Sequence, residues 1–136
     1  ESAHFRAPEV ALGLSMSWGS IPRLINLVGP ARAKQILILS DQRVGSADAA
    51  AWGLAQDVTP DGHAVVRALE IARAAAEMPP LTVRMTKQAV NAVANATARA
   101  SIYMDTEQVI LSGMTGDHKE AVAAFKEKRK PRFTGE

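Results

Sequence analysis

The sequence predicts a mostly α-helical chain that has short extended pieces near its start. Apolar residues recur every three or four positions over most of its length, which is the spacing of one helix face. Glycines, prolines and capping residues divide this pattern into segments of helix length. With 136 residues, of which 47% are hydrophobic and 22% are charged, the chain suits one domain with a modest core.

The N-terminal part is predicted to be extended, then looped, then helical. Pro8 biases the residue before it away from helical backbone angles, so the opening segment is expected to be extended. A loop follows over Gly13–Gly19, and Ser20 is the expected N-cap of the first helix. Gly29–Pro30 ends this helix and begins another over residues 31–39, where periodicity alone leaves a buried strand open.

The middle of the chain is predicted to contain one short helix between loops. Residues 40–45 form a polar loop, and Ser46 caps an alanine-rich helix that ends at Gly53. A brief extended piece over 54–58 comes next. The sequence Thr-Pro-Asp-Gly at 59–62 is typical of a turn.

Helices dominate the second half of the sequence. Apolar positions at helical spacing predict helices over 63–78, 81–95 and 98–111. Pro79–Pro80 breaks the first of these from the second. Asp117 is the expected N-cap of a last helix, because Glu120 stands three positions later as in a capping box.

Composition excludes several classes of protein. The absence of cysteine excludes a disulfide scaffold and a thiolate metal site, and the three histidines lack the spacing of a zinc-binding helix. No apolar run approaches the roughly 18 residues of a membrane span, and the first residues lack the pattern of a signal peptide. We therefore expect a soluble, cytoplasmic protein without a metal. Because the apolar residues near Glu1 have the character of the inside of a fold, we also expect this chain to be part of a larger polypeptide.

Positive charge is concentrated near the C-terminus. The formal net charge is only +2, but five of the sixteen basic residues lie within seven positions. These five are Lys126, Lys128, Arg129, Lys130 and Arg132. Such a cluster binds phosphates of a nucleic acid or of a small ligand, or forms a solvated tail. Phe125 directly before it can stack on an adenine while Lys128 holds a phosphate, although spacing alone favours a core phenylalanine before a solvated charged run.

Other candidate residues lie in the N-terminal loops. Glu9 follows a proline among apolar neighbours, a setting that suits a general acid or base, although a single loop glutamate is more often a solvated carboxylate. Residues 15–20 precede a helix, where they either offer backbone N–H groups to an anion or form only a capped helix start. We expect four further polar side chains to face solvent, namely Lys87, Asn91, Asp105 and His118.

Five segments in order carry a pattern that runs along the whole chain. Residues 5–14 hold a proline–glutamate pair before a leucine–glycine, and residues 46–54 end in glycine–leucine. The other segments are 23–33, 86–91 and 124–133. Together they resemble the enoyl-CoA hydratase/isomerase (crotonase) superfamily. The resemblance implies an α/β crotonase-like (ClpP/crotonase) fold, of which this chain is the mostly α C-terminal part with short extended pieces near its start.

The resemblance also implies acyl-CoA chemistry. Family enzymes hold the thioester carbonyl of a substrate such as trans-2-enoyl-CoA in an oxyanion hole of two backbone N–H groups, which stabilises an enolate. Glu9 matches a glutamate that protonates the α-carbon or helps to activate water. Coenzyme A is then part of the substrate, and no separate cofactor is expected.

Binding residues and assembly follow from the same resemblance. It implies substrate contacts at Leu12, Gly13, Ser17, Trp18 and Gly19, and contacts to the adenine and phosphates of coenzyme A at Phe125 and Lys128. The implied assembly is a homotrimer or a hexamer (a dimer of trimers). Residues 1–58 would end the crotonase core, and residues 59–136 would form a helical region for oligomerisation and CoA contact.

The chain departs from the family in two respects. The family's first glutamate and both oxyanion-hole segments have no match in these residues, so we expect this chain alone to be inactive. The usual proline-glycine-x-glycine-glycine loop is here Met16–Ser20, in which Ser17 replaces a glycine and Trp18 is bulky. Hydration, isomerisation, another family reaction and a changed acyl specificity all stay open.

The sequence also leaves open two functions that are not enzymatic. One is a non-catalytic acyl-CoA-binding or oligomerisation module that kept the fold. The other is a nucleic-acid binder, which fits poorly because aromatic residues make up only 4% of the chain and the positive charges form no stripe along a helix.

Overall fold

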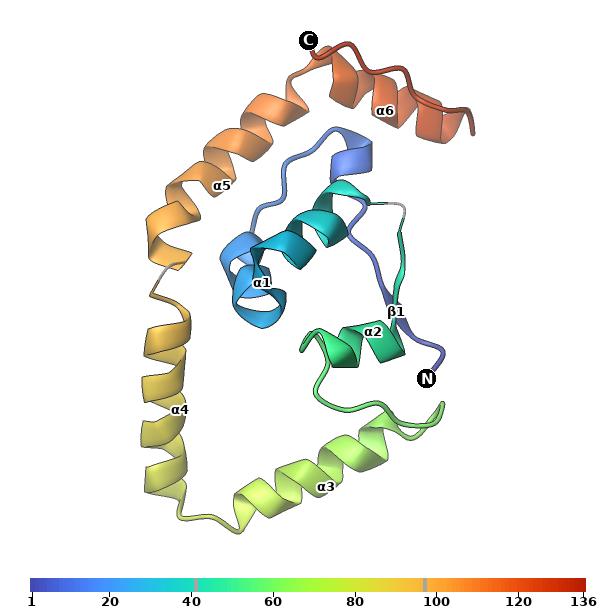
Figure 1. The fold of residues 1–136 in the computed structure, drawn as a ribbon. Helices are drawn as coiled ribbons and strands as arrows, with labels where there is room; N and C mark the ends of the chain where they lie inside the picture. Colours follow the sequence, from blue (N-terminus) through green and yellow to red (C-terminus); the bar gives the residue numbers. More distant parts are fainter. Residues whose placement is uncertain (41, 97) are drawn as a thin grey trace.

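The computed structural model describes residues 1–40, 42–96 and 98–136. Helices dominate this part of the chain, as predicted. In order, the elements are β1 (His4–Phe5), the 3-10 helix η1 (Val10–Leu12), α1 (Ser20–Ile38), β2 (Val44–Gly45), α2 (Ser46–Ala51), α3 (Ala64–Ala76), α4 (Pro80–Ala94), α5 (Ala98–Gly113) and α6 (Gly116–Lys126). Figure 1 shows β1, α1 and α2 as an inner group, around which α3, α4, α5 and α6 follow one another as an outer arc. The helices predicted over 63–78, 81–95 and 98–111 correspond to α3, α4 and α5.

The core lies within the inner group. β1 and β2 pair in antiparallel fashion, with His4 opposite Gly45 and Phe5 opposite Val44. Small and medium apolar side chains pack beside this pair. They are Ala7, Val28, Ala33, Ile36, Val44 and Ala49. Because no large side chain is fully buried in the described part of the chain, this core is small.

Two helical pieces joined at Gly29 make up α1. Gly29 has φ 75° and ψ 165°, angles that glycine adopts readily and other residues do not. Pro30 follows it and begins the second piece, a position that suits proline. The predicted break at Gly29–Pro30 is therefore confirmed, and the apolar stretch after it is helix and not strand.

The N-caps differ from the prediction. The predicted caps Ser20, Ser46 and Asp117 each lie inside the first turn of their helices. The residues at the cap positions are Gly19, Gly45 and Thr115. The prediction was wrong because these polar side chains bond elsewhere: the Ser20 hydroxyl, for example, donates to the Ser17 carbonyl.

Short irregular segments also differ from the prediction. Val10–Leu12 is a 3-10 helix where extended chain was expected, and Val44–Gly45 is a strand within a predicted loop, of which residue 41 lies outside the described residues. Residues 54–58 form no strand. A strand of two residues is too short to show apolar–polar alternation in the sequence, so β2 could not be predicted in this way.

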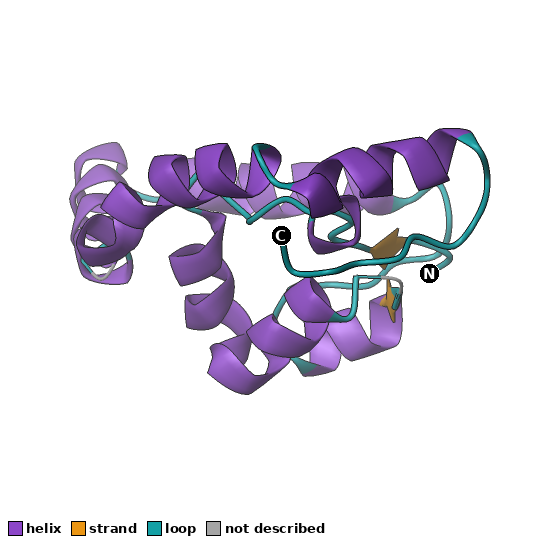
Figure 2. Cartoon of the chain, turned by 90° about the horizontal axis from the view of Figure 1, so that it is seen from above, coloured by secondary structure: helices purple, strands orange, loops and turns teal. Residues whose placement is uncertain are grey.

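The outer arc leaves much apolar surface uncovered. Neither α3 nor α4 has a buried residue, and Figure 2 shows the arc as a layer with the inner group to one side of it. The chain exposes 10011 Å², whereas a compact monomer of 14.5 kDa exposes about 6,900 Å². The helices of the arc therefore need a covering surface that this chain does not itself supply.

The described residues contain neither a helix that could span a membrane nor a cluster of metal ligands. No helix there combines the length and the apolar character needed to cross a bilayer. No group of three or more His, Asp or Glu side chains there could hold a metal ion.

Candidate functional site

Glu9 lies at the start of η1, directly after Pro8. Its backbone angles are φ −56° and ψ −47°, and its carbonyl accepts hydrogen bonds from the N–H groups of Leu12 at 2.9 Å and Leu14 at 3.0 Å. The side chain is half-buried, and its Oε2 is buried without a hydrogen-bond partner among the described residues. A buried polar atom is normally bonded, so this carboxylate oxygen is available to a bound molecule.

The turn that carries Glu9 is held by α6. The carbonyl of Leu12 accepts a hydrogen bond of 2.7 Å from Nδ1–H of His118. The next residue, Gly13, has φ 68°, and a Cβ atom built there would lie 2.8 Å from Cα of His118. Glycine is therefore required at this position both for its backbone angle and for the close approach of α6. His118 was expected to be exposed without a partner, which was wrong.

The loop between η1 and α1 is held by α5. The N–H of Ser15 donates to Oγ of Ser112 at 3.0 Å, and the Ser15 hydroxyl donates to Oε1 of Gln108 at 3.3 Å. At the other end of the loop, the N–H of Gly19 donates to Oδ2 of Asp105. Asp105 is buried, so the expectation that it faces solvent was also wrong.

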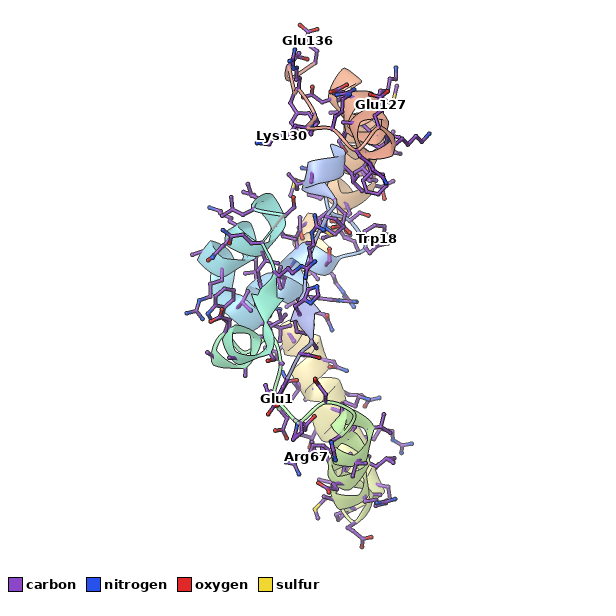
Figure 3. The ribbon with its side chains drawn as sticks, turned by 90° about the vertical axis from the view of Figure 1, so that its right-hand side faces the viewer. Glu1, Trp18, Arg67, Glu127, Lys130 and Glu136 are labelled. Atoms are coloured by element: carbon purple, nitrogen blue, oxygen red, sulfur yellow. The ribbon has the colours of Figure 1, made fainter. Side chains whose placement is uncertain are left out.

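Within this loop, Ser17 and Trp18 differ in exposure. Ser17 is buried, whereas the side chain of Trp18 is 74% exposed and lies away from the ribbon in Figure 3. Trp18 has φ 63°, a left-handed angle that is uncommon for a bulky residue. Leu12 and Gly13 on the turn are half-buried, and Gly19 is buried.

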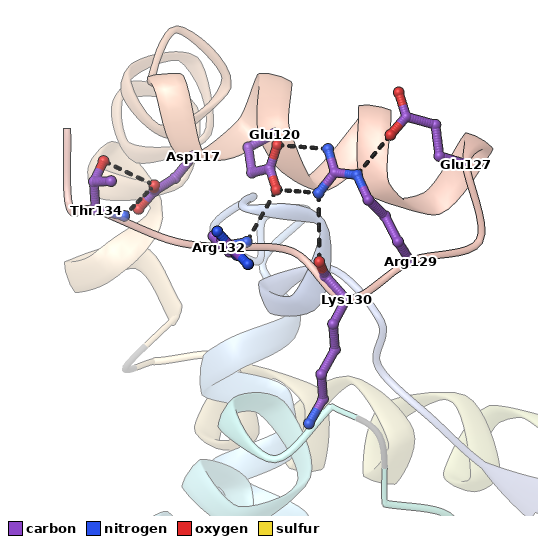
Figure 4. A network of polar contacts seen from close by, with 7 residues as sticks. All are labelled: Asp117, Glu120, Glu127, Arg129, Lys130, Arg132 and Thr134. Atoms are coloured by element: carbon purple, nitrogen blue, oxygen red, sulfur yellow. Dashed lines mark hydrogen bonds and ion pairs between the residues drawn. The ribbon is translucent and has the colours of Figure 1, made fainter.

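At the C-terminus, the tail after α6 folds back along the helix. The carboxylate of Glu120 accepts hydrogen bonds from both terminal nitrogens of Arg129 and from the N–H of Arg132. Asp117 accepts hydrogen bonds from the N–H groups of residues 134 and 135. Figure 4 shows this network without the bond from residue 135. It lowers the pKa of Glu120 to about 2, chiefly through the hydrogen bonds from Arg129.

The predicted CoA contacts lie beside this network. Phe125 is 75% exposed, so it is not a core residue, and Lys128 is exposed with φ 54°. A shallow groove on α6 reaches from the His118 end of the helix to Lys126 and Glu127. It is lined by His118, Lys119, Val122, Ala123, Lys126 and Glu127. The groove therefore runs from the helix end that holds the Glu9 turn to the end that carries Phe125.

Sequence reasoning missed the residues that hold the site. Asp105, Gln108 and Ser112 stand at i, i+3 and i+7, which places them on one helix face. A polar stripe at this spacing is the signal that could have found them. His118 gave no such signal, because its partner is a backbone carbonyl 106 residues away. Lys87 and Asn91 are exposed, as expected.

The comparisons with known proteins all point to one family. Residues 1–136 match the family model described as enoyl-CoA hydratase/isomerase. The chain is 32% identical over 135 residues to 2,3-dehydroadipyl-CoA hydratase of Escherichia coli K12, covering 99% of this chain and 52% of that protein. It is 34% identical over 129 residues to short-chain-enoyl-CoA hydratase of Clostridium acetobutylicum, covering 95% of this chain and 49% of that protein. The crystal structure of enoyl-CoA hydratase/isomerase from Pseudoalteromonas atlantica T6c superimposes with a TM-score of 0.88 at 30% identity, covering 97% of this chain and 53% of the other.

The chain belongs to the enoyl-CoA hydratase/isomerase family. Its helices are the mostly α part of a crotonase-like fold, which confirms the fold class that the sequence resemblance implied. The chain spans about half the length of the curated relatives that it matches.

Proposed function

We propose that this chain is the C-terminal, proton-transferring and CoA-contacting part of an enoyl-CoA hydratase/isomerase-type enzyme that acts on trans-2-enoyl-CoA. The observation that carries the proposal is the buried, unpartnered Oε2 of Glu9. It lies on a turn that α6 holds in place, and α5 holds the loop that follows this turn. A fixed carboxylate whose oxygen has no protein partner is suited to exchange a proton with a substrate.

In this proposal, Glu9 works together with groups outside the chain. An oxyanion hole from the remaining part of the enzyme polarises the thioester carbonyl and stabilises the enolate. Glu9 then gives a proton to the α-carbon or helps to activate the water that adds at the β-carbon. The chain alone would be inactive, because it supplies the carboxylate without the oxyanion hole.

The acyl group and the coenzyme A moiety occupy different parts of the chain. We assign the acyl group to the turn and loop formed by Leu12, Gly13, Ser17, Trp18 and Gly19. The adenine would stack on the exposed ring of Phe125, and Lys128 would hold a phosphate. Coenzyme A enters as part of the substrate, and the reaction uses no other cofactor.

We further propose that the enzyme is a homotrimer or a dimer of trimers in the cytoplasm. The exposed apolar faces of α3 and α4 support an assembly, because apolar surface of this extent is normally covered in a soluble protein. Acyl-CoA is the partner, and neither nucleic acid nor membrane is expected to bind.

The test is a hydration assay on the complete polypeptide that contains this chain. Loss of the conjugated enoyl-thioester absorbance measures turnover. Glu9→Gln should slow kcat by roughly 100- to 10,000-fold, the range expected for a general acid or base. Glu77→Gln removes an exposed carboxylate at the end of α3 and should leave the rate unchanged. Equal rates for Glu9→Gln and the wild type would remove Glu9 from the mechanism.

A second function, a non-catalytic acyl-CoA-binding module, is favoured by one observation. The exposed Trp18 stands in the loop where the family has small residues, so the loop differs in the region assigned to the acyl group. Calorimetry separates the two functions: CoA binding without any turnover of the complete polypeptide would favour the module, and measurable turnover would rule it out.

A further inference from the structure

One face of α5 bonds to the loop that follows the Glu9 turn. Its polar side chains Asp105, Gln108 and Ser112 lie at helical spacing and all contact Ser15 or Gly19. The loop is thus fixed at both ends by a helix that lies more than 80 residues away in the sequence. Nothing in the proposed function yet gives these side chains a role.

Asp105 differs from the other two because it is charged and buried. Burial of a carboxylate costs free energy unless hydrogen bonds compensate it. Among the described residues, Asp105 accepts a hydrogen bond from the amide of Gly19. A bond from an N–H to a carboxylate is stronger than one to a neutral oxygen. For packing of α5 against α1 alone, an apolar side chain would serve at this position.

The backbone that Asp105 holds has an unusual conformation. Trp18 and Gly19 have consecutive left-handed φ angles of 63° each. A bulky residue in this region is strained and keeps such an angle only where its surroundings enforce it. Two hydrogen bonds flank the pair and do so, one from the Gly19 N–H to Asp105 and one from the Ser20 hydroxyl to the Ser17 carbonyl.

The fixed loop is continuous with the turn that carries Glu9. The N–H of Leu14 donates to the carbonyl of Glu9 at 3.0 Å, and the next residue, Ser15, is held by Ser112. We propose that Asp105 is a positioning residue: by bonding to Gly19 it fixes the loop over residues 15–19 and, through it, the placement of the acyl group against Glu9. This inference rests on the proposed function.

The test compares Asp105→Ala and Asp105→Asn with the wild type in the complete polypeptide. Asp105→Ala should lower kcat roughly 10- to 100-fold, because a small misplacement of reacting groups has an effect of that size. KM should change little, since the assigned CoA contacts, Phe125 on α6 and Lys128 after its end, are not part of this loop. Asp105→Asn keeps an oxygen acceptor of the same size and should lose only about 3- to 10-fold. Glu107→Gln, which changes an exposed carboxylate on the same helix, should match the wild type.

Hydrogen–deuterium exchange of the peptide that contains Gly19 gives a readout independent of turnover. Exchange should be fastest in Asp105→Ala, intermediate in Asp105→Asn and native in Glu107→Gln. If Asp105→Ala does not fold, Asp105→Asn still tests the positioning role, provided that its circular dichroism is native. Native kcat and native exchange in Asp105→Asn would then overturn the inference.

The two proposals fail in different ways. An absence of turnover in the wild-type protein would end the proposed function, whereas the exchange experiment would still report on the contact with Asp105. Native exchange around Gly19 in a folded Asp105→Ala variant would overturn the positioning role, whatever the rate. A fall in kcat with native exchange would overturn it as well, since Asp105 would then act by another route.

Discussion

Glu120 is a carboxylate near the surface that anchors a chain end. It accepts hydrogen bonds from two nitrogens of Arg129 and from the backbone of Arg132, so that the tail turns back along α6. These bonds all favour the charged carboxylate, which is why its pKa falls to about 2 from an ordinary value of 4.5. One of the basic residues near the C-terminus, Arg129, is thus used for structure and not for a ligand.

This anchor predicts a loss of stability in acid. Because the pKa of Glu120 is lower in the folded chain, the folded state binds fewer protons than the unfolded state in the range between these two pKa values, from about 2 to 4.5. The contribution of Glu120 to the free energy of unfolding is complete above pH 4.5 and is lost as the pH falls towards about 2. We therefore compare urea unfolding of the wild type and Glu120→Gln between roughly pH 5 and pH 2.5, a range that is close to the two pKa values. The unfolding midpoint of the wild type should fall more steeply over this range than that of Glu120→Gln. Parallel curves for the two proteins would contradict this anchor.

Single residues were predicted unevenly from the sequence. Glu9 and Phe125 were proposed as site residues because each stands in a local motif, a proline–glutamate pair and an aromatic residue before basic residues, and their roles stay predictions. Asp105 was placed in solvent because its spacing with Gln108 and Ser112 was not considered. His118 was placed there because a lone polar residue on a helix gives no local sign of its partner. Their partners are the amide of Gly19 and the carbonyl of Leu12, and backbone groups are present at every position of a sequence.

At the scale of elements, the contact of α6 with η1 depends on one glycine. Gly13 lies against the backbone of His118 at the start of α6, and its left-handed φ ends the 3-10 turn. The hydrogen bond from His118 to Leu12 lies beside this contact. The position of the Glu9 turn relative to α6 is therefore set by the absence of a side chain at position 13.

Substitution of this glycine should separate the two elements. Gly13→Ala adds a left-handed alanine and a clash with backbone, which together should destabilise the protein by about 1–3 kcal/mol. Gly62→Ala is the matched control, because Gly62 has φ 82° with nothing within 4 Å of the added Cβ. Urea unfolding should show a clearly smaller loss for Gly62→Ala. Equal losses of unfolding free energy in the two variants would mean that the close approach of α6 to Gly13 adds nothing to the effect of the substitution.

Helix positions were predictable where glycine and proline interrupt the chain. The break at Gly29 and the start of α4 at Pro80 follow from local backbone chemistry. The caps were not predictable in this way, because tertiary contacts compete for the same polar groups. Asp117 bonds to the returning tail and leaves the cap position of α6 to Thr115.

At the scale of the whole molecule, the exposed area is the main feature. The 10011 Å² of this chain exceeds the value for a compact monomer by roughly 3,000 Å². An excess of this size lies in the range of large obligate interfaces, which bury 2,000 Å² or more. α3 and α4 contribute to it, because neither helix has a buried residue and their apolar faces are exposed.

A charge on the apolar face of α4 should weaken assembly without affecting the helix. Val93 is 79% exposed in this chain. In the proposed assembly, Val93→Asp would place an unpaired carboxylate in the interface. We expect the association constant to fall roughly tenfold or more, with unchanged circular dichroism. Gln88→Asp is the control. Helical spacing places Gln88 on the polar face of α4, so this variant adds the same charge there and should leave the mass of the assembly in solution unchanged. If both variants assemble as the wild type does, this face is not part of an interface.

The bonds that hold residues 9–19 also set an order of events during synthesis. They join positions that are 86, 97 and 106 residues apart. A ribosome adds about 5–20 residues per second, so the segment with Glu9 waits roughly 5–20 s before α5 and α6 exist. Until then the nascent chain contains the carboxylate but not the turn that presents it. The turn that presents Glu9 therefore forms only after α5 and α6 have been made, although its own residues are made well before them.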